Sequence, residues 1–127
     1  QLAIIGRSLG GAVAVKLSKL VKGVLLISPV FDLKQWNYPF SVEKDLIDIP
    51  MLQMHAGSDE VLGLDHYASY VRCALKNHEI HLIKNADHTY SDEKIRKNLG
   101  LECQKWFINL FHGSTHAASN RATQVET

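Results

Sequence analysis

The sequence predicts an α/β fold built on a parallel sheet of about four strands with flanking helices. Short apolar runs of strand length occur four times along the chain, and a helical pattern follows three of them. The first two runs are nearly continuous in apolar residues, which is typical of parallel strands covered on both faces. Strands that alternate with helices are joined by crossovers into one parallel sheet. The predicted strands cover residues 2–5, 24–28, 51–55 and 79–83.

The first half of the chain contains two strands and one helix. Residues 2–5 are apolar and end at Gly6, and a helical pattern over 9–20 follows. Gly23 is a suitable left-handed cap for the end of that helix. The strand at 24–28 ends at Pro29. The helix positions expected to pack on the sheet, from their helical spacing, are Val13, Leu17 and Leu20.

The second half of the chain begins with an irregular segment over 30–50. Strands at 51–55 and 79–83 flank a helix predicted over 64–76, and a long helix is predicted over 91–111. The inner face of the first of these helices is expected at Tyr67, Tyr70, Val71 and Leu75. The packing positions of the long helix are expected at Ile95, Leu99, Trp106 and Leu110.

The length of 127 residues favours one domain. We assign residues 1–111 to this domain. Residues 112–127 are small and polar, and we expect them to form a disordered tail. The chain begins with Gln1, inside a predicted strand. We therefore expect that part of the domain precedes this sequence.

The composition excludes several classes of protein. Lys and Arg number 14 against 13 Asp and Glu, so nothing indicates a nucleic-acid partner. No apolar run approaches the roughly 20 residues of a membrane span. The seven histidines do not fall at metal-ligand spacing, and no metal is expected. The only cysteines, Cys73 and Cys103, favour a reduced, cytoplasmic protein in which both are buried as small apolar residues.

A G-x-S-x-G pentapeptide lies between the first strand and the first helix, as Gly6-Arg7-Ser8-Leu9-Gly10. At such a junction this pattern is typical of the nucleophile elbow of serine hydrolases. The turn strains the serine backbone, and glycines two residues before and after it remove Cβ atoms that would collide. The alternative is an ordinary turn in which the Ser8 side chain caps the helix.

Two further polar residues follow strands in the same way. Asp59 follows the third predicted strand and His88 follows the fourth. Because the carboxyl ends of parallel strands meet at one edge of a sheet, we expect both side chains to lie at the same edge as Ser8.

The order Ser8, Asp59, His88 is the order of the catalytic triad in the α/β-hydrolase superfamily. The string around Asp59, H-A-G-S-D, resembles the acid turn of that superfamily, with Ala56 in place of the usual glycine. The string A-D-H that ends at His88 resembles its histidine loop. The chain thus resembles the C-terminal half of an α/β-hydrolase fold, from the nucleophile strand onward, over about residues 1–111.

The resemblance implies a serine hydrolase that needs no cofactor. Ser8 would be the nucleophile, His88 the general base and Asp59 the residue that orients the imidazole. The backbone N–H of Leu9 would supply one oxyanion donor. In the superfamily the second donor comes from a loop after an earlier strand, which we expect to precede this sequence. A small or medium carboxylic ester is the expected substrate.

Several alternatives remain open at this stage. The same fold includes peptidases similar to serine aminopeptidases and prolyl oligopeptidases, which act on amide bonds. The chain could also be a truncated remnant without activity. Trp36, Tyr38 and Phe40 lie where the superfamily carries a lid, and they either line an acyl pocket or pack a long loop.

Other residues near the candidate triad also have more than one interpretation. Glu60 is a weaker alternative to Asp59. His55 is expected to brace the acid turn, and His66 to be solvated or packed on its helix. Arg7 is expected in a salt bridge at the sheet edge, with a role toward the substrate as the alternative.

Overall fold

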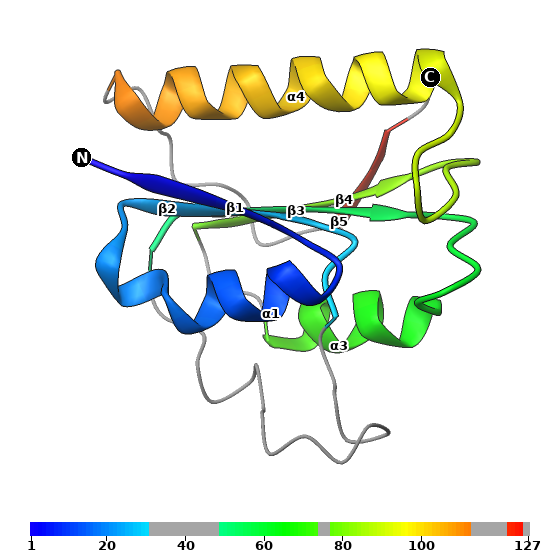
Figure 1. Ribbon diagram of the computed structural model, residues 1–127, viewed down its shortest axis with the longest axis horizontal. Coiled ribbons are helices and arrows are strands. Elements are labelled where there is room, and N and C mark those ends of the chain that lie inside the picture. Colours follow the sequence, from blue (N-terminus) through cyan, green and yellow to red (C-terminus); the bar gives the residue numbers. More distant parts are fainter. Residues whose placement is uncertain (31–48, 74–76, 113–121, 126–127) are drawn as a thin grey trace.

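The computed structural model describes residues 1–30, 49–73, 77–112 and 122–125 (Figure 1). The strands are β1 Ala3–Arg7, β2 Gly23–Ile27, β3 Met51–Ala56, β4 His78–Ile83 and β5 Ala122–Val125. The helices are α1 Leu9–Lys16, the short 3₁₀ helix η1 Ser18–Leu20, α3 Leu64–Cys73 and α4 Glu93–Phe111. The four predicted strands and three predicted helices are all present in this set.

The strands form one parallel sheet in the order β1-β2-β3-β4-β5. Helix α4 covers one face of the sheet, and α1 and α3 cover the other (Figure 1). The predicted α/β class is therefore confirmed. Since all strands point the same way, their carboxyl ends lie at one edge of the sheet.

The fifth strand differs from the sequence prediction. Residues 122–125 pair in parallel with β4, with Ile80 opposite Ala122 and Ile83 opposite Val125. The prediction of a disordered tail is therefore wrong at these four residues. An open strand edge is a template for pairing, and the β-branched Thr123 and Val125 suit a strand. The other residues of the predicted tail, from 113 on, lie outside the described part of the chain.

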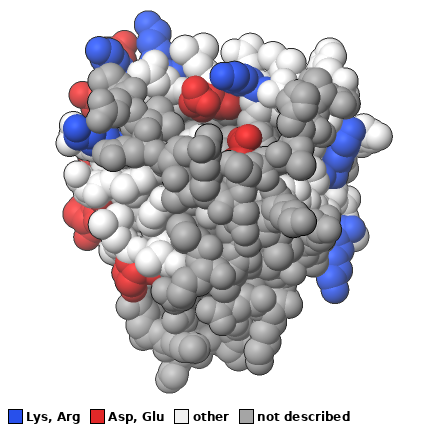
Figure 2. All heavy atoms as spheres, turned by 180° about the vertical axis from the view of Figure 1, so that it is seen from behind, with Lys and Arg blue, Asp and Glu red and all other residues white. Residues whose placement is uncertain are grey.

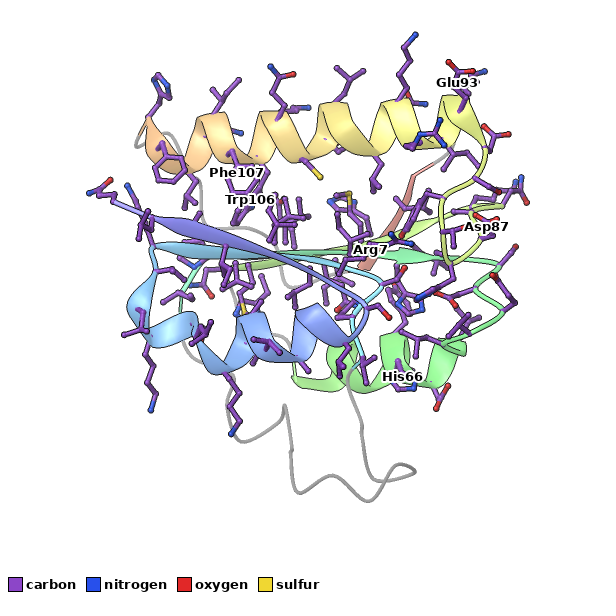
Figure 3. All side chains as sticks on the ribbon, viewed as in Figure 1. Arg7, His66, Asp87, Glu93, Trp106 and Phe107 are labelled. Carbon is purple, nitrogen blue, oxygen red and sulfur yellow. The ribbon has the colours of Figure 1, made fainter. Side chains whose placement is uncertain are left out.

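Strand residues alternate between two apolar layers, one on each face of the sheet. On the face of α1 and α3, Val24, Leu26 and Met51 pack with Leu62. On the face of α4, strand residues such as Leu25 and Met54 pack against the helix. The side chains of Trp106 and its neighbour Phe107 point from α4 to the sheet (Figure 3). Of the four packing positions predicted for this helix, Ile95, Trp106 and Leu110 are buried. The fourth, Leu99, is partly buried.

Helix α1 packs on the sheet through a different face from the one predicted. Val13, Leu17 and Leu20 are 52, 39 and 76% exposed. The buried residues of α1 are small, namely Gly11, Ala12, Ala14 and Val15. The tight turn before α1 holds its first turn so close to the sheet that only small side chains fit beneath it. Leu9 and Val13 of α1 face outward instead, as do Leu17 after the helix and Leu20 in η1.

Charged side chains of both signs lie around the rim of the face shown in Figure 2. This distribution accords with the nearly balanced composition, which has a formal net charge of +1. Across the described ranges, none of the helices combines the length and the apolar character that crossing a membrane requires.

Candidate active site

Ser8 lies at the junction of β1 and α1 with a strained backbone. Its φ of 51° and ψ of −123° fall outside the regions that side-chain-bearing residues favour. Three backbone hydrogen bonds hold it there: its N–H donates to Ile27, and its carbonyl accepts from Gly11 and Val30. The strain predicted for this position is confirmed.

The glycines around Ser8 permit the turn, although not in the pattern predicted. A Cβ on Gly6 would lie 2.4 Å from the carbonyl oxygen of Gly10 and 2.7 Å from the Cβ of Ala14. A Cβ on Gly10 would meet nothing within 4 Å among the described residues, so the collision predicted there is wrong. Gly11 has that role instead, because a Cβ on it would lie 2.4 Å from the Cβ of Pro29.

The Ser8 side chain does not cap α1. No side-chain hydrogen bond is made at this helix start, and the Gly11 N–H is satisfied by the Ser8 backbone carbonyl. The interpretation of the pentapeptide as a turn with a side-chain cap is therefore wrong. The Ser8 Oγ lies 3.2 Å from Nε2 of His88 instead.

His88 lies between Ser8 and Asp59. Its Nδ1 is 2.7 Å from Oδ2 of Asp59, while its Nε2 approaches Ser8. The three residues follow β1, β3 and β4, so each is carried by the carboxyl end of a strand at the same sheet edge. His88 is 8% exposed, and the Asp59 side chain is 1% exposed. The structure thus joins the three residues in one largely buried chain of hydrogen bonds.

Hydrogen bonds lower the pKa of the Asp59 carboxyl group. Burial by itself raises the pKa of this carboxyl group, but bonds from the Leu62 N–H, the His88 ring and the Val61 N–H outweigh it, and the pKa falls below its ordinary value. Asp59 is therefore ionised at neutral pH and only accepts. The Nδ1–H of His88 must donate to it, which leaves Nε2 of the neutral ring as the acceptor for the Ser8 hydroxyl.

Among solved structures that resemble this arrangement of strands and helices is an esterase domain. It comes from a protein of Rhodothermus marinus, with a TM-score of 0.73 and 20% sequence identity. The chain has an α/β-hydrolase-like fold. The match covers 82% of this chain and 59% of that one, so the chain spans less than two thirds of the esterase domain's length. No family model and no curated protein sequence matches the chain.

The other predicted site residues of this α/β-hydrolase-like fold are distributed as follows. Leu9 is the first residue of α1, where a backbone N–H has no partner within the helix. Its role as an oxyanion donor stays a prediction, as do the roles of Ser8, Asp59 and His88. Trp36, Tyr38 and Phe40 lie outside the described residues.

Arg7 and Glu60 contact the backbone of His88. Arg7 donates to the His88 carbonyl at 3.1 Å, so the contact found for it in the described structure is a hydrogen bond to the backbone and not the expected salt bridge. Glu60 accepts from the His88 N–H at 3.1 Å and does not replace Asp59 at the ring.

Two further histidines are buried near the site. His55 Nε2 lies 3.4 Å from the Leu62 carbonyl, within the loop whose N–H groups bind Asp59, and so it braces the acid turn as expected. His66 is 5% exposed on α3, which agrees with packing rather than solvation.

The sequence did not identify two supporting residues beneath the site. The hydroxyls of Ser28, at the end of β2, and Tyr90, two residues after His88, are both buried and form a hydrogen bond. Burial raises the pKa of Tyr90 to about 12. A serine directly after a buried strand is the one signal that could have indicated this pair.

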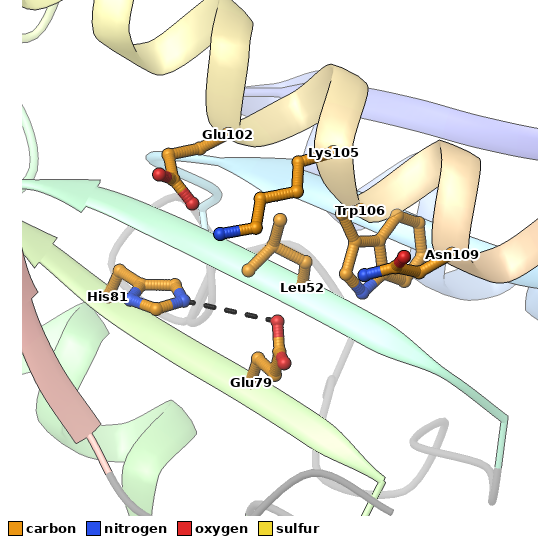
Figure 4. Close-up of a pocket in the computed structure, with 7 residues that line it drawn as sticks. All are labelled: Leu52, Glu79, His81, Glu102, Lys105, Trp106 and Asn109. Atoms are coloured by element: carbon orange, nitrogen blue, oxygen red, sulfur yellow. Dashed lines mark ion pairs between the residues drawn. The ribbon is translucent and has the colours of Figure 1, made fainter. Parts of the chain in front are cut away.

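A separate pocket of about 180 Å³ lies between α4 and the sheet (Figure 4). It is near the beginnings of β3 and β4, whereas the candidate active site lies at their carboxyl ends, and the two share no residue. Its lining includes Leu52, Glu79, His81, Glu102, Lys105 and Trp106. Within the described ranges no group of three or more His, Cys, Asp or Glu side chains could hold a metal ion.

Proposed function

We propose that the protein is a serine hydrolase that cleaves carboxylic esters through an acyl-enzyme on Ser8. The observation that supports this most is the continuous hydrogen-bonded chain from the Ser8 hydroxyl through His88 to the ionised Asp59. The strained Ser8 backbone and the lack of a side-chain cap support it further, because both leave the hydroxyl directed at His88.

In the first half of the reaction, Ser8 Oγ attacks the acyl carbon while His88 Nε2 takes the hydroxyl proton. Asp59 stabilises the imidazolium that forms. The C–O bond to the alcohol then breaks, and His88 returns the proton to the departing alkoxide. An acyl ester on Ser8 and a free alcohol result.

In the second half, water attacks the acyl carbon and gives a proton to His88. The bond to Ser8 Oγ breaks, and His88 returns the proton to Ser8. The net reaction consumes one ester and one water, and it yields one carboxylic acid and one alcohol. The Leu9 N–H donates to the oxyanion in both tetrahedral intermediates. Loss of one such donor costs about 10²–10³ in kcat, so a second donor is expected in the complete site.

Labelling with a fluorophosphonate probe tests the nucleophile. We expect Ser8→Ala to abolish labelling and to lower p-nitrophenyl acetate hydrolysis by about 10³-fold or more. Ser58→Ala is the matched control, because Ser58 is an exposed serine beside Asp59, and it should label like the wild type. Equal labelling of Ser8→Ala and the wild type would show that Ser8 is not the nucleophile.

The choice of an ester over a peptide bond needs its own comparison. We expect p-nitrophenyl esters to be hydrolysed with higher kcat/KM than amino-acid p-nitroanilides of similar size. The solved structure described above, which resembles this chain, is an esterase domain, and this favours an ester as the better substrate. Faster hydrolysis of the anilides would show that the substrate class is an amide and not an ester.

A further inference from the structure

The backbone of His88 is held at both of its polar atoms by charged side chains. The Arg7 guanidinium donates to its carbonyl oxygen at 3.1 Å, and a Glu60 carboxylate oxygen accepts from its N–H at 3.1 Å. Arg7 precedes Ser8 in the sequence and Glu60 follows Asp59. The neighbours of the candidate nucleophile and of the candidate acid therefore both reach the peptide groups of the histidine.

These two hydrogen bonds fix the backbone of His88, which the contacts of its ring do not. Asp59 and Ser8 fix the orientation of the imidazole ring, but they contact only its nitrogen atoms. The position of the His88 Cα is set by its backbone. Other hydrogen bonds of this loop lie to either side of His88: Ser58 N–H donates to the Ala86 carbonyl, and Ser91 N–H donates to Asp87 Oδ1. Within the described residues, Arg7 and Glu60 are the groups that bond the His88 N–H and carbonyl directly.

The distance to Ser8 makes this placement important. His88 Nε2 is 3.2 Å from the Ser8 Oγ, at the long end of the hydrogen-bond range. A further displacement of about 1 Å can cost 10²-fold in rate. Asn85 and Tyr90, on either side of His88, both have positive φ, so the loop follows a path that needs outside support.

We propose that Arg7 and Glu60 are positioning residues, which hold the His88 backbone so that the imidazole spans the gap between Asp59 and Ser8. The proposal rests on the function proposed above. Both side chains are exposed, so water screens their charges. Their effect comes mainly from hydrogen-bond geometry, and an uncharged group of the same shape should retain much of it.

The kinetic test uses substitutions that separate geometry from charge. Glu60→Gln keeps an acceptor oxygen at the same reach, whereas Glu60→Ala and Arg7→Met remove the bond. We expect Glu60→Ala and Arg7→Met to lower kcat for p-nitrophenyl acetate by about 10-fold, less than the cost of a full 1 Å displacement. KM should stay within about twofold. Glu60→Gln should stay close to the wild type.

Matched controls come from α4. Glu93, at the exposed start of this helix (Figure 3), and Lys97 carry the same charges without contacting His88. Glu93→Ala and Lys97→Met should leave kcat unchanged. A loss in Glu60→Gln as large as in Glu60→Ala, or a rise in KM at constant kcat, would overturn the positioning role. So would a fall in kcat that merely follows a lower thermal unfolding temperature.

A second measurement does not require hydrolysis. In protein labelled with ¹⁵N-histidine, the Nδ1 proton shared by His88 and Asp59 gives its own resonance, which Asp59→Asn identifies by removing it. We expect Glu60→Ala and Arg7→Met to speed exchange of this proton with water, and Glu60→Gln to leave it unchanged. Exchange as slow in Glu60→Ala as in the wild type would overturn the proposal. If the wild type hydrolyses no ester, the proposed function fails, while this measurement still decides whether the two residues hold His88.

Discussion

The hydroxyl groups of Ser28 and Tyr90 lie 2.9 Å apart, although 62 residues separate them in the sequence. Ser28 Oγ also accepts from the N–H of Ala56 at 3.1 Å. These bonds connect the ends of β2 and β3 with the loop that carries His88. Both residues have positive φ, of 42° and 53°. The buried polar group therefore holds together three backbone segments beneath the candidate site.

A double-mutant cycle measures this connection. Tyr90→Phe removes one buried hydrogen bond, and we expect it to lower the free energy of unfolding by about 0.5–1.5 kcal/mol. Ser28→Ala should cost more, because it leaves both the Ala56 N–H and the Tyr90 hydroxyl without this partner. The double variant should be less destabilised than the sum of the two, as measured by urea unfolding. Additivity within about 0.5 kcal/mol would mean that the two hydroxyls do not interact.

Two adjacent glycines should respond in opposite directions to the same substitution. Gly11→Ala places a Cβ 2.4 Å from that of Pro29, and we expect it to cost about 1–3 kcal/mol of stability. Gly10→Ala, on the open side of the same helix, should gain up to about 1 kcal/mol from helix propensity. Thermal unfolding of both variants is the measurement. Equal changes in the unfolding temperature of the two variants would show that Gly11 does not lie close to Pro29.

Asp59 should make stability depend on acid pH. The hydrogen bonds that lower its pKa below 3.8 stabilise the fold fully above that value, and this contribution is lost as the pH falls through the lower pKa of the folded state. Asp59→Asn removes the titrating group. The stability difference between wild type and variant should therefore shrink as the pH falls below about 3.8. Urea midpoints measured from pH 7 downward test this, and a constant difference would contradict it.

His55 should make the stability of the fold depend on pH in a higher range than Asp59 does. Burial lowers its pKa below the ordinary value of 6.5, so the folded protein binds a proton here less readily than the unfolded chain. This contribution to stability is complete above pH 6.5 and decreases as the pH falls below it. His55→Gln, which keeps a donor for the Leu62 carbonyl, should flatten the decrease in urea midpoint between pH 7 and pH 5. Parallel curves for the two proteins would rule this out.

Residues that depend on local patterns were predictable from the sequence. The apolar runs that became β1 to β4 needed no tertiary information, since a buried parallel strand is apolar on both faces. Ser8, Asp59 and His88 were predicted to meet because each directly follows one of these runs. The strain at Ser8 was predicted from the pentapeptide, although Gly11 and not Gly10 makes the second close approach.

Features that depend on how elements approach one another were not predictable. The spacing of Val13, Leu17 and Leu20 gave a reasonable apolar face for α1, but the elbow turned the small residues of that helix to the sheet. Polar residues of the tail contained no periodic pattern, and strand β5 formed because the edge of β4 was open to pairing. Contacts of single charged groups, such as Arg7 and Glu60, leave no pattern in a sequence.

The sequence by itself determined the fold class, the parallel direction of the strands and the three residues carried to one sheet edge, because strand and helix periodicity and chain order are local properties. Only the tertiary structure decided that the Ser8 hydroxyl turns away from its own helix toward His88, and that Arg7 and Glu60 hold the histidine backbone. Both depend on hydrogen-bond distances of 3.1–3.2 Å between segments remote in sequence. Such distances are set by the packing of the whole sheet edge and not by any one of its strands.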